Sequence, residues 1–192
     1  MSDQSSTSQF DILCDLEEQE KYVELLNMSV EALLKNSKDI YMQTWYGVAL
    51  KGLKRYEEAI TVFKRVLDVD RDHYPAEAAL AEAYLDSEQY DLAVRECRTI
   101  LKKYHKNRGV FIDGLQIMGN AFGRQGKYIL AEVAYKHILM LDPNNEYAGL
   151  NYLYSLHKQG VYSKGMLDSY EENPKFLLKI WHMENTLFNN TI

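Results

Sequence analysis

The sequence predicts an all-α solenoid, a fold in which one helical hairpin is stacked repeatedly. Apolar residues recur at i, i+3, i+4 and i+7, the spacing of amphipathic helices. Only three prolines and ten glycines occur among the 192 residues, which favours a mostly helical chain. Five tyrosines recur at intervals of 34, 34, 38 and 34 residues, and each begins a similar segment: Tyr22, Tyr56, Tyr90, Tyr128 and Tyr162. A fixed period of this size is typical of repeat proteins, which expose long binding surfaces.

The chain is expected to begin with a flexible tail at residues 1–8 and a degenerate helical pair at residues 9–39. The tail is rich in Ser, Thr, Gln and Asp, a composition typical of disordered termini. Residues 1–24 carry seven acidic side chains and one lysine, whereas residues 25–192 are balanced in charge. We expect this acidic pair to cap one end of the array; steering of a basic partner is the alternative.

Three full repeats are predicted next, each with a first helix, a short turn and a second helix. Repeat 1 spans residues 40–73, repeat 2 spans 74–107 and repeat 3 spans 112–145, with an insertion at 108–111. Small residues recur where the paired helices would touch: Gly47, Ala81 and Gly119 on the first helices, and Ala59, Ala93 and Ala131 on the second. A larger side chain at these positions would separate the helices. The basic segment Lys102–Phe111, around the insertion, predicts a solvated loop after a helix C-terminus, with an anion or acidic-partner contact as the alternative.

The C-terminal part is predicted to be a truncated repeat 4 at residues 146–173 and a final helix at residues 174–192. Pro174 disfavours a helical residue before it, so the second helix of repeat 4 should end early. The final helix is strongly apolar and is expected to cap the last repeat. The alternative is a second interface, with large apolar anchors at Phe176, Trp181 and Phe188.

At these positions the chain resembles the tetratricopeptide repeat family, whose unit is a helix–turn–helix of about 34 residues. The resemblance covers roughly residues 9–172 and implies a right-handed helix–turn–helix solenoid with a capping C-terminal helix. It also implies that the first helices line a concave groove that binds a peptide or helix of a partner protein. The best matches are in repeats 1 and 3: Gly47, Tyr56, Ala59, Phe63, Gly119, Phe122, Tyr128, Ala131, Tyr135 and Pro143.

The resemblance assigns twelve side chains to the partner-binding groove. Trp45 is the expected main anchor, because tryptophan often dominates the energy of interfaces; its burial against the preceding unit is the alternative. Lys51, Ala78 and Ala79 also fall at groove positions. The predicted groove residues are Tyr41, Thr44, Trp45, Val48, Glu82, Asp86, Gln116, Asn120, Arg124, Asn151, Tyr154 and Lys158.

No sequence pattern supports catalysis, a cofactor or a metal site, so none is expected. The sequence has no Gly-rich phosphate loop, HExxH, CxxC or GxSxG, and its five histidines are scattered. The balanced charge of residues 25–192 argues against nucleic-acid binding, and no apolar run approaches the ~20 residues of a membrane span. Two cysteines and the absence of a visible secretory signal predict a reducing compartment, the cytoplasm or the nucleus.

The expected function is that of a non-catalytic adaptor or scaffold that binds another protein in its groove. Two alternatives stay open. The first is a dedicated client chaperone, resembling the small acidic tetratricopeptide chaperones of bacterial secretion systems. The second is a structural subunit that forms homo-oligomers through the C-terminal helix.

Overall fold

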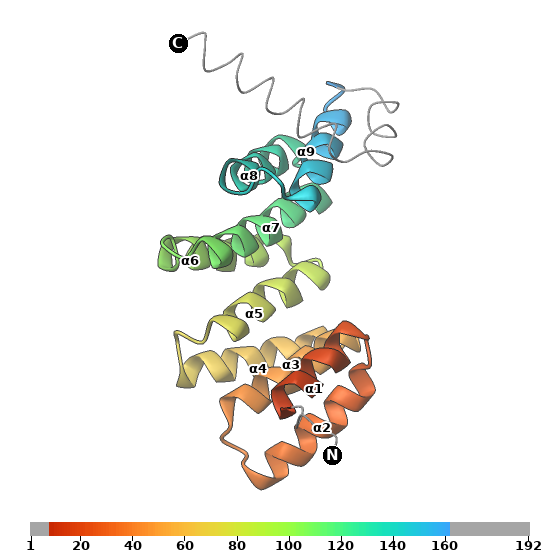
Figure 1. Ribbon diagram of the computed structural model, residues 1–192, viewed down its shortest axis with the longest axis vertical. Coiled ribbons are helices and arrows are strands. Elements are labelled where there is room, and N and C mark those ends of the chain that lie inside the picture. Colours follow the sequence, from red (N-terminus) through yellow and green to blue (C-terminus); the bar gives the residue numbers. More distant parts are fainter. Residues whose placement is uncertain (1–7, 162–192) are drawn as a thin grey trace, which may run out of the picture. The chain divides into compact units, whose positions relative to one another are not determined.

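The computed structural model describes residues 8–161, which form nine α-helices within that range (Figure 1). The chain divides into two compact units, Met1–Gln89 and Tyr90–Ile192. Unit 1 contains α1 (Gln9–Glu18), α2 (Tyr22–Lys35), α3 (Ile40–Gly52), α4 (Tyr56–Val69) and α5 (Tyr74–Asp86). Unit 2 contains α6 (Tyr90–Lys103), α7 (Arg108–Arg124), α8 (Tyr128–Leu141) and α9 (Glu146–Lys158). The predicted all-α repeat fold is confirmed; the final helix at 174–192, with Phe176, Trp181 and Phe188, lies outside the described residues.

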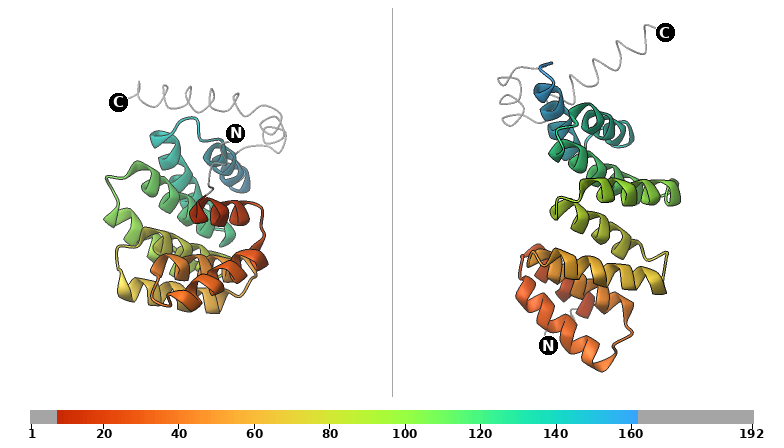
Figure 2. Two further views of the ribbon diagram at one scale, coloured as in Figure 1. Left: turned by 60° about the horizontal axis from the view of Figure 1, so that its bottom comes forward. Right: turned by 180° about the vertical axis from the view of Figure 1, so that it is seen from behind.

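Within each unit, helices that follow one another in the chain pack side by side. In unit 1 each of α1 to α4 packs against the next helix, and α3 also contacts both α1 and α5. In unit 2 the chain of contacts runs from α6 to α9 in order, and the helices alternate in direction (Figure 2). Four of the five tyrosines that mark the period begin the second helix of a pair: Tyr22, Tyr56, Tyr90 and Tyr128. Tyr162 lies outside the described residues. The 34-residue rhythm therefore marks a position in a helical hairpin.

The turns before these tyrosines share one backbone geometry. The N–H of Arg55 bonds back to the carbonyl of Leu50 at 2.9 Å, and the N–H of Lys127 bonds to the carbonyl of Phe122 at 2.9 Å. This closure requires a left-handed residue just before the donor, a conformation that suits glycine. Five residues adopt it with positive φ: Glu20 at 54°, Lys54 at 61°, Glu88 at 62°, Gly126 at 74° and Gly160 at 78°. The two units thus close the same turn with different residue types.

Side-chain caps begin four of the first helices. The hydroxyl of Ser8 accepts from the N–H of Asp11, whose carboxylate accepts from the N–H of Ser8. This capping box ties Ser8, the last residue of the predicted tail, to the start of α1; residues 1–7 lie outside the described residues. Asp39, Asn107 and Asn145 cap α3, α7 and α9 in the same way.

The insertion at 108–111 is helical, so the loop expected within Lys102–Phe111 is confined to residues 104–107. Helix α7 begins at Arg108 and has 17 residues, compared with 13 in α3, α5 and α9. Asn107 explains the early start, because its side chain accepts a hydrogen bond from the N–H of Val110 at 3.3 Å. The four residues therefore add a turn to a helix, while Lys102 and Lys103 lie in the last turn of α6.

Small residues allow the paired helices to touch, as predicted. A Cβ atom built on Gly47 would lie 2.5 Å from the ring of Phe63, and one on Gly119 would lie 2.9 Å from the ring of Tyr135. Phe63 is fully buried, so its ring has little room to move. At each glycine, an aromatic ring of the paired helix packs against the backbone, and this contact sets the distance between the two helices.

Candidate partner-binding site

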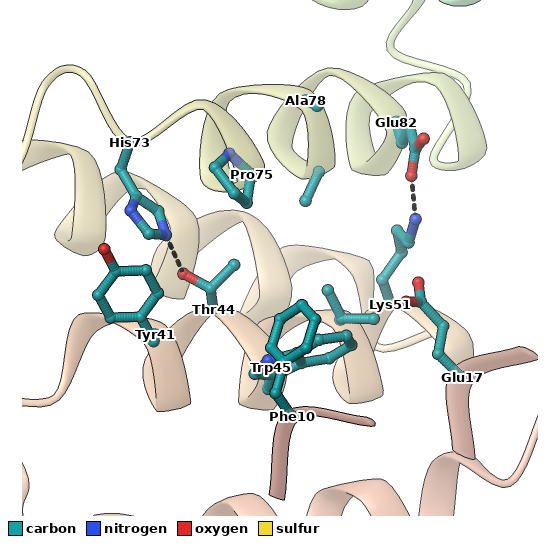
Figure 3. A pocket seen from close by; sticks show the side chains of 12 residues that line it. Phe10, Glu17, Tyr41, Thr44, Trp45, Lys51, His73, Pro75, Ala78 and Glu82 are labelled. Carbon is teal, nitrogen blue, oxygen red and sulfur yellow. Dashed lines mark hydrogen bonds and ion pairs between the residues drawn. The ribbon is translucent and has the colours of Figure 1, made fainter. Parts of the chain in front are cut away.

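Unit 1 contains a pocket of ≈ 300 Å³ lined by side chains of α1, α3, α5 and the residue that precedes α5 (Figure 3). We call it the unit 1 pocket. Five predicted groove residues line it: Tyr41, Thr44, Trp45, Val48 and Glu82. The other lining residues are Phe10, Glu17, Lys51, His73, Pro75, Ala78 and Ala79. The pocket combines an apolar floor with polar groups at its two ends.

The apolar floor centres on Trp45. The ring of Phe10, from α1, meets the Trp45 ring edge-on at a centroid distance of 6.0 Å and an interplanar angle of 70°. Trp45 is half-buried by this contact, whereas Phe10 itself is 62 % exposed. Trp45 thus lines the pocket and also packs against α1 of the preceding helical pair, and its role as an anchor stays a prediction. Val48, Pro75 and Ala78 extend the apolar surface.

One end of the pocket is charged. The ammonium of Lys51 donates to a carboxylate oxygen of Glu82, and only 16 % of the Lys51 side chain is exposed. Burial acts to lower the pKa of Lys51, but the contact with Glu82 outweighs it and the pKa is raised. Glu17 reaches the same end from α1 (Figure 3). Burial raises the pKa of Glu17, and Lys51 offsets that effect only in part.

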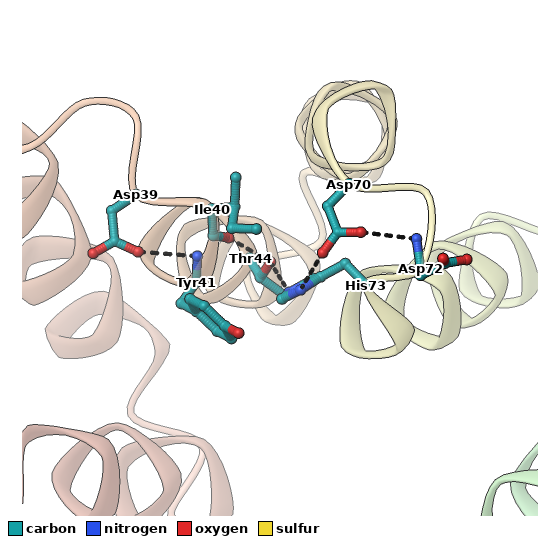
Figure 4. Close-up of polar contacts among 7 residues, drawn as sticks. All are labelled: Asp39, Ile40, Tyr41, Thr44, Asp70, Asp72 and His73. Carbon is teal, nitrogen blue, oxygen red and sulfur yellow. Dashed lines mark hydrogen bonds and ion pairs between the residues drawn. The ribbon is translucent and has the colours of Figure 1, made fainter.

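At the other end, His73 and Thr44 form a buried polar contact (Figure 4). The Thr44 hydroxyl donates to the Ile40 carbonyl at 2.7 Å, so its oxygen accepts from Nε2 of His73 at 3.1 Å. Nδ1 of His73 lies 3.9 Å from Asp70, and the His73 ring meets Tyr41 edge-on at 5.0 Å. Burial lowers the pKa of His73, which keeps the imidazole neutral near pH 7.

The order Thr44–His73–Asp70 resembles a nucleophile–base–acid series, but its hydrogen bonds run the wrong way. The threonine proton is already committed to a backbone carbonyl, and the imidazole donates to the hydroxyl oxygen. A general base must instead accept the proton of the nucleophile. The contact therefore fixes the start of α5 against α3 and does not activate Thr44.

Besides Lys51, Ala78 and Ala79, which fall at groove positions, four lining residues were not predicted. Phe10 and Glu17 lie 34 residues before Thr44 and Lys51, so extending the repeat register into the degenerate first pair finds both. Pro75 likewise follows Tyr41 by 34 residues. His73 has no such signal, because it is the last residue of a repeat. Asp86, a predicted groove residue of α5, does not line the unit 1 pocket.

Unit 2 contains a separate pocket of ≈ 360 Å³, the unit 2 pocket, which is polar and aromatic. The hydroxyls of Tyr135 and Tyr147 both donate to the side-chain carbonyl of Asn120, each at 2.7 Å. Burial and the neighbouring Tyr147 raise the pKa of Tyr135, so its hydroxyl stays a neutral donor. Four predicted groove residues line this pocket with Gly123, Tyr135, Tyr147 and Ser155: Asn120, Arg124, Asn151 and Tyr154.

Several polar groups of the unit 2 pocket bond within the unit. The side-chain carbonyl oxygen of Asn120, a predicted groove residue, accepts two phenolic hydroxyls. Asn151 donates to the Tyr147 carbonyl at 2.9 Å. Lys158 lies outside the lining, with its ammonium 5.2 Å from the centre of the Tyr154 ring, and Gln116 is also outside. The polar contacts of this pocket hold its own aromatic side chains in place.

The outer face of α8 forms a further exposed surface. It is apolar at register positions where α4 and α6 are polar or charged, and Ile129 and Met140 are 66 % and 63 % exposed. The corresponding positions are Glu57, Asp91 and Ile129; Thr61, Arg95 and Val133; and Asp68, Lys102 and Met140. Leu130 and Leu141 are exposed beside this stripe. Exposed apolar patches of this kind mark interaction surfaces.

No group of three or more His, Cys, Asp or Glu side chains within residues 8–161 is placed to hold a metal ion. Over the same range, no helix is both long and apolar enough to cross a bilayer.

Comparison with known proteins identifies the repeat. The tetratricopeptide repeat family model matches residues 50–110, and no curated protein matches the chain. A tetratricopeptide repeat protein from Parabacteroides merdae ATCC 43184 is similar in structure, with a TM-score of 0.68, 15 % identity, and coverage of 98 % of this chain and 75 % of that one. MamA, residues 41 to the end, from Desulfovibrio magneticus RS-1 has a TM-score of 0.66 at 16 % identity, covering 93 % of this chain and 98 % of that one.

MamA of MSR-1 is also similar, with a TM-score of 0.61 at 19 % identity and coverage of 91 % and 95 %. At these identities the likeness concerns the fold alone. Together with the matched repeat model and the sequential helical pairs, it supports one conclusion. The chain has the tetratricopeptide repeat fold, and its residues 50–110 match the model of that family.

Proposed function

We propose that this protein is a non-catalytic interaction adaptor that binds a short segment of a partner protein, a peptide or a helix, in the unit 1 pocket. The observation that carries the proposal is the pocket's composition. Three helices supply an apolar floor around Trp45, and a fixed ion pair of Lys51 and Glu82 stands at one end. Pockets that take a side chain of a partner combine such apolar area with a few oriented polar groups.

Exposure of the aromatic side chains supports the same reading of the pocket. Phe10 and Tyr41 are 62 % and 64 % exposed although both border it. Aromatic rings bury a large area at a small cost in conformational entropy, which makes them frequent anchors of interfaces. A bound segment would cover both rings and complete the burial of Trp45.

The test is affinity purification from native extract with three versions of the full-length protein. They are the wild type, Trp45→Ala, and Tyr46→Ala as a matched control. Tyr46 is the next residue of α3 and is also half-buried, but it lines a different surface with Leu50 and Glu57. Circular dichroism and urea unfolding check that each variant is folded, and quantitative mass spectrometry compares the recovered proteins.

The expected result is a protein recovered with wild type and Tyr46→Ala but reduced at least about tenfold with Trp45→Ala, the size of effect typical of a hot-spot residue. The isolated partner should then bind purified wild-type protein directly. Equal recovery with all three versions would contradict the unit 1 pocket as the binding site.

A second candidate function is self-assembly, and the apolar outer face of α8 favours it. A two-fold axis would bring this face against the same face of a second copy, so that identical apolar residues cover one another. Ile129, Val133 and Met140 would lie at the centre of such a contact. This differs from assembly through residues 174–192, which lie outside the described residues.

Light scattering at several protein concentrations tests this candidate. Val133→Glu should convert a dimer to a monomer, because a carboxylate at the centre of an apolar contact is costly to bury. Thr61→Glu is the matched control, since Thr61 is exposed at the same register position of α4. A wild-type protein that is monomeric at all concentrations would rule out the α8 contact.

A further inference from the structure

The charged end of the unit 1 pocket contains more carboxylates than ammonium groups. Glu17 and Glu82 line the pocket with a single lysine, Lys51, and Lys51 is committed to Glu82. Within the described residues, Glu17 has no hydrogen-bond donor and no cation at ion-pair distance. The end of the pocket therefore has one negative charge without a close partner.

This charge lies beside the apolar floor. Lys51 follows Trp45 and Val48 along α3 by six and three residues, and Glu17 follows Phe10 on α1 by seven residues, two helical turns. Figure 3 shows the Glu17 side chain reaching toward the Lys51–Glu82 pair, with Trp45 and Phe10 farther along the pocket. A ligand that fills the apolar floor would thus extend naturally to the two carboxylates.

We propose that the partner segment carries a lysine or arginine within about one helical turn of its apolar anchor, and that this cation binds between Glu17 and Glu82. The proposal rests on the proposed function of the pocket and names the chemistry of its partner. Charge complementarity decides the class: a basic group finds an uncompensated carboxylate, whereas an acidic group meets a lysine that is already paired and a glutamate that repels it. Arginine suits the site particularly well, because its planar fork can bond two carboxylates at once.

The electrostatics of the empty pocket agree with this. Burial raises the pKa of Glu17, Glu82 and Glu18 raise it further, and only Lys51 acts against them. The ionised form of Glu17 is therefore disfavoured until a further cation arrives. The charge of Asp86 on α5 also acts to raise the pKa of Lys51, and it adds to the negative potential at this end of the pocket.

The experiment is selection of a random dodecapeptide display library on purified full-length protein. Selection is run in parallel on wild type, Trp45→Ala, Glu17→Gln and Glu18→Gln. Glu18 is the neighbouring residue of α1 and is exposed outside the pocket, so Glu18→Gln removes the same charge without touching the site. Enriched peptides are then synthesised with their cation kept or replaced by glutamine or glutamate, and their dissociation constants are measured by fluorescence anisotropy.

The expected library result is a set of peptides that depends on Trp45 and pairs an apolar residue with lysine or arginine one to four positions away. Replacing the cation with glutamine should weaken binding to wild type and Glu18→Gln about tenfold, the effect of one charge-assisted contact. Glutamate should weaken it further. In Glu17→Gln, the difference in affinity between the basic and the glutamine peptides should be much smaller than in wild type, because only Glu82 remains to bind the cation.

The outcomes separate the two proposals. Peptides that require Trp45 but show no preference for cations, or that favour acidic residues, would overturn this inference and leave the proposed function in place. Failure to enrich any peptide that depends on Trp45 would count against both. A cation preference as large in Glu17→Gln as in wild type would show that other groups provide it and would overturn the assignment of Glu17.

Discussion

The two units share one repeat pattern but carry side chains of different polarity at equivalent positions. In unit 2, Asn120 occupies the repeat position that Val48 occupies in unit 1, and Tyr135 occupies the position of Phe63. In unit 2 these two residues are joined by a hydrogen bond of 2.7 Å, whereas their counterparts in unit 1 are apolar and buried. The backbone pattern is shared, but the unit 1 pocket presents apolar area and the unit 2 pocket uses polar groups to hold its own rings.

The difference teaches that groove position alone does not make a binding residue. Asn120 and Val48 occupy equivalent positions, yet the side-chain carbonyl oxygen of Asn120 already accepts from two phenols of its own unit. Trp45, in contrast, keeps a face toward an open pocket. A partner therefore gains more by covering the apolar surface of unit 1 than by competing for hydrogen bonds already made in unit 2.

The largest expected effect comes from removing the ring that joins α3 to α4. Phe63→Ala should reduce the free energy of unfolding by about 3–5 kcal/mol, because it empties a fully buried site beside Gly47. Hydrogen exchange should rise most in α3 and α4, since a repeat depends mainly on its neighbours. Equal acceleration in α8 and α9 would show that the two units unfold together.

Exchanging equivalent side chains between the two units should change the free energy of unfolding by less than Phe63→Ala does. Phe63→Tyr is expected to cost about 1–3 kcal/mol, because a buried hydroxyl lacks the partner that Asn120 provides in unit 2. Adding Val48→Asn should recover part of that loss. Tyr135→Phe should cost about 0.5–1.5 kcal/mol for its lost hydrogen bond. Urea unfolding measures all three variants. A double variant no more stable than Phe63→Tyr would contradict the equivalence of these positions in the two units.

The turns offer a smaller test of the same comparison. Lys54→Gly should raise stability by about 0.5 kcal/mol, because it relieves a positive φ of 61° in unit 1. Gly126→Ala should lower stability by about 1 kcal/mol in unit 2, where nothing lies near the added Cβ and only the backbone is strained. If both variants changed the stability in the same direction, the left-handed conformation of these two residues would not be the cause.

The smallest expected effect on stability at neutral pH comes from substituting His73. Burial lowers its pKa in the folded protein below the ordinary ~6.5 of an unfolded chain. The unfolded chain therefore takes up the proton first as pH falls, and the stability contributed by neutral His73 is lost from about pH 6.5 downward through the folded pKa. His73→Gln should show a shallower fall between about pH 7 and 5 in urea titrations. His137→Gln, at an exposed site of α8, should match wild type; identical slopes for all three would contradict the prediction.

Much of the fold was predictable because the same residue pattern recurs in successive repeats. Each hairpin needs a tyrosine at the start of its second helix and small residues at the crossing, so four imperfect copies identify the pattern. The insertion was misassigned because basic residues suggested a loop, while the cap provided by Asn107 starts a helix there. A single capping side chain outweighed the composition of the segment.

The candidate site was predictable only in part. Register placed Trp45, Val48 and Glu82 in one pocket, and the same register extended one repeat back would have added Phe10 and Glu17. Side-chain pairing was not predictable, because it depends on rotamers that no spacing rule specifies. The groove residues remain a prediction until binding is measured.

The glycine-on-ring crossings have a consequence for how this sequence can change over generations. Gly47 cannot gain even a methyl group while Phe63 covers it, since the added Cβ would lie 2.5 Å from the ring. The ring must shrink first, and only then can the glycine grow, so the two mutations are acceptable in one order and harmful in the other. Repeat 2 carries Ala81 and Cys97 at these two register positions, the end point that this order of substitutions would reach.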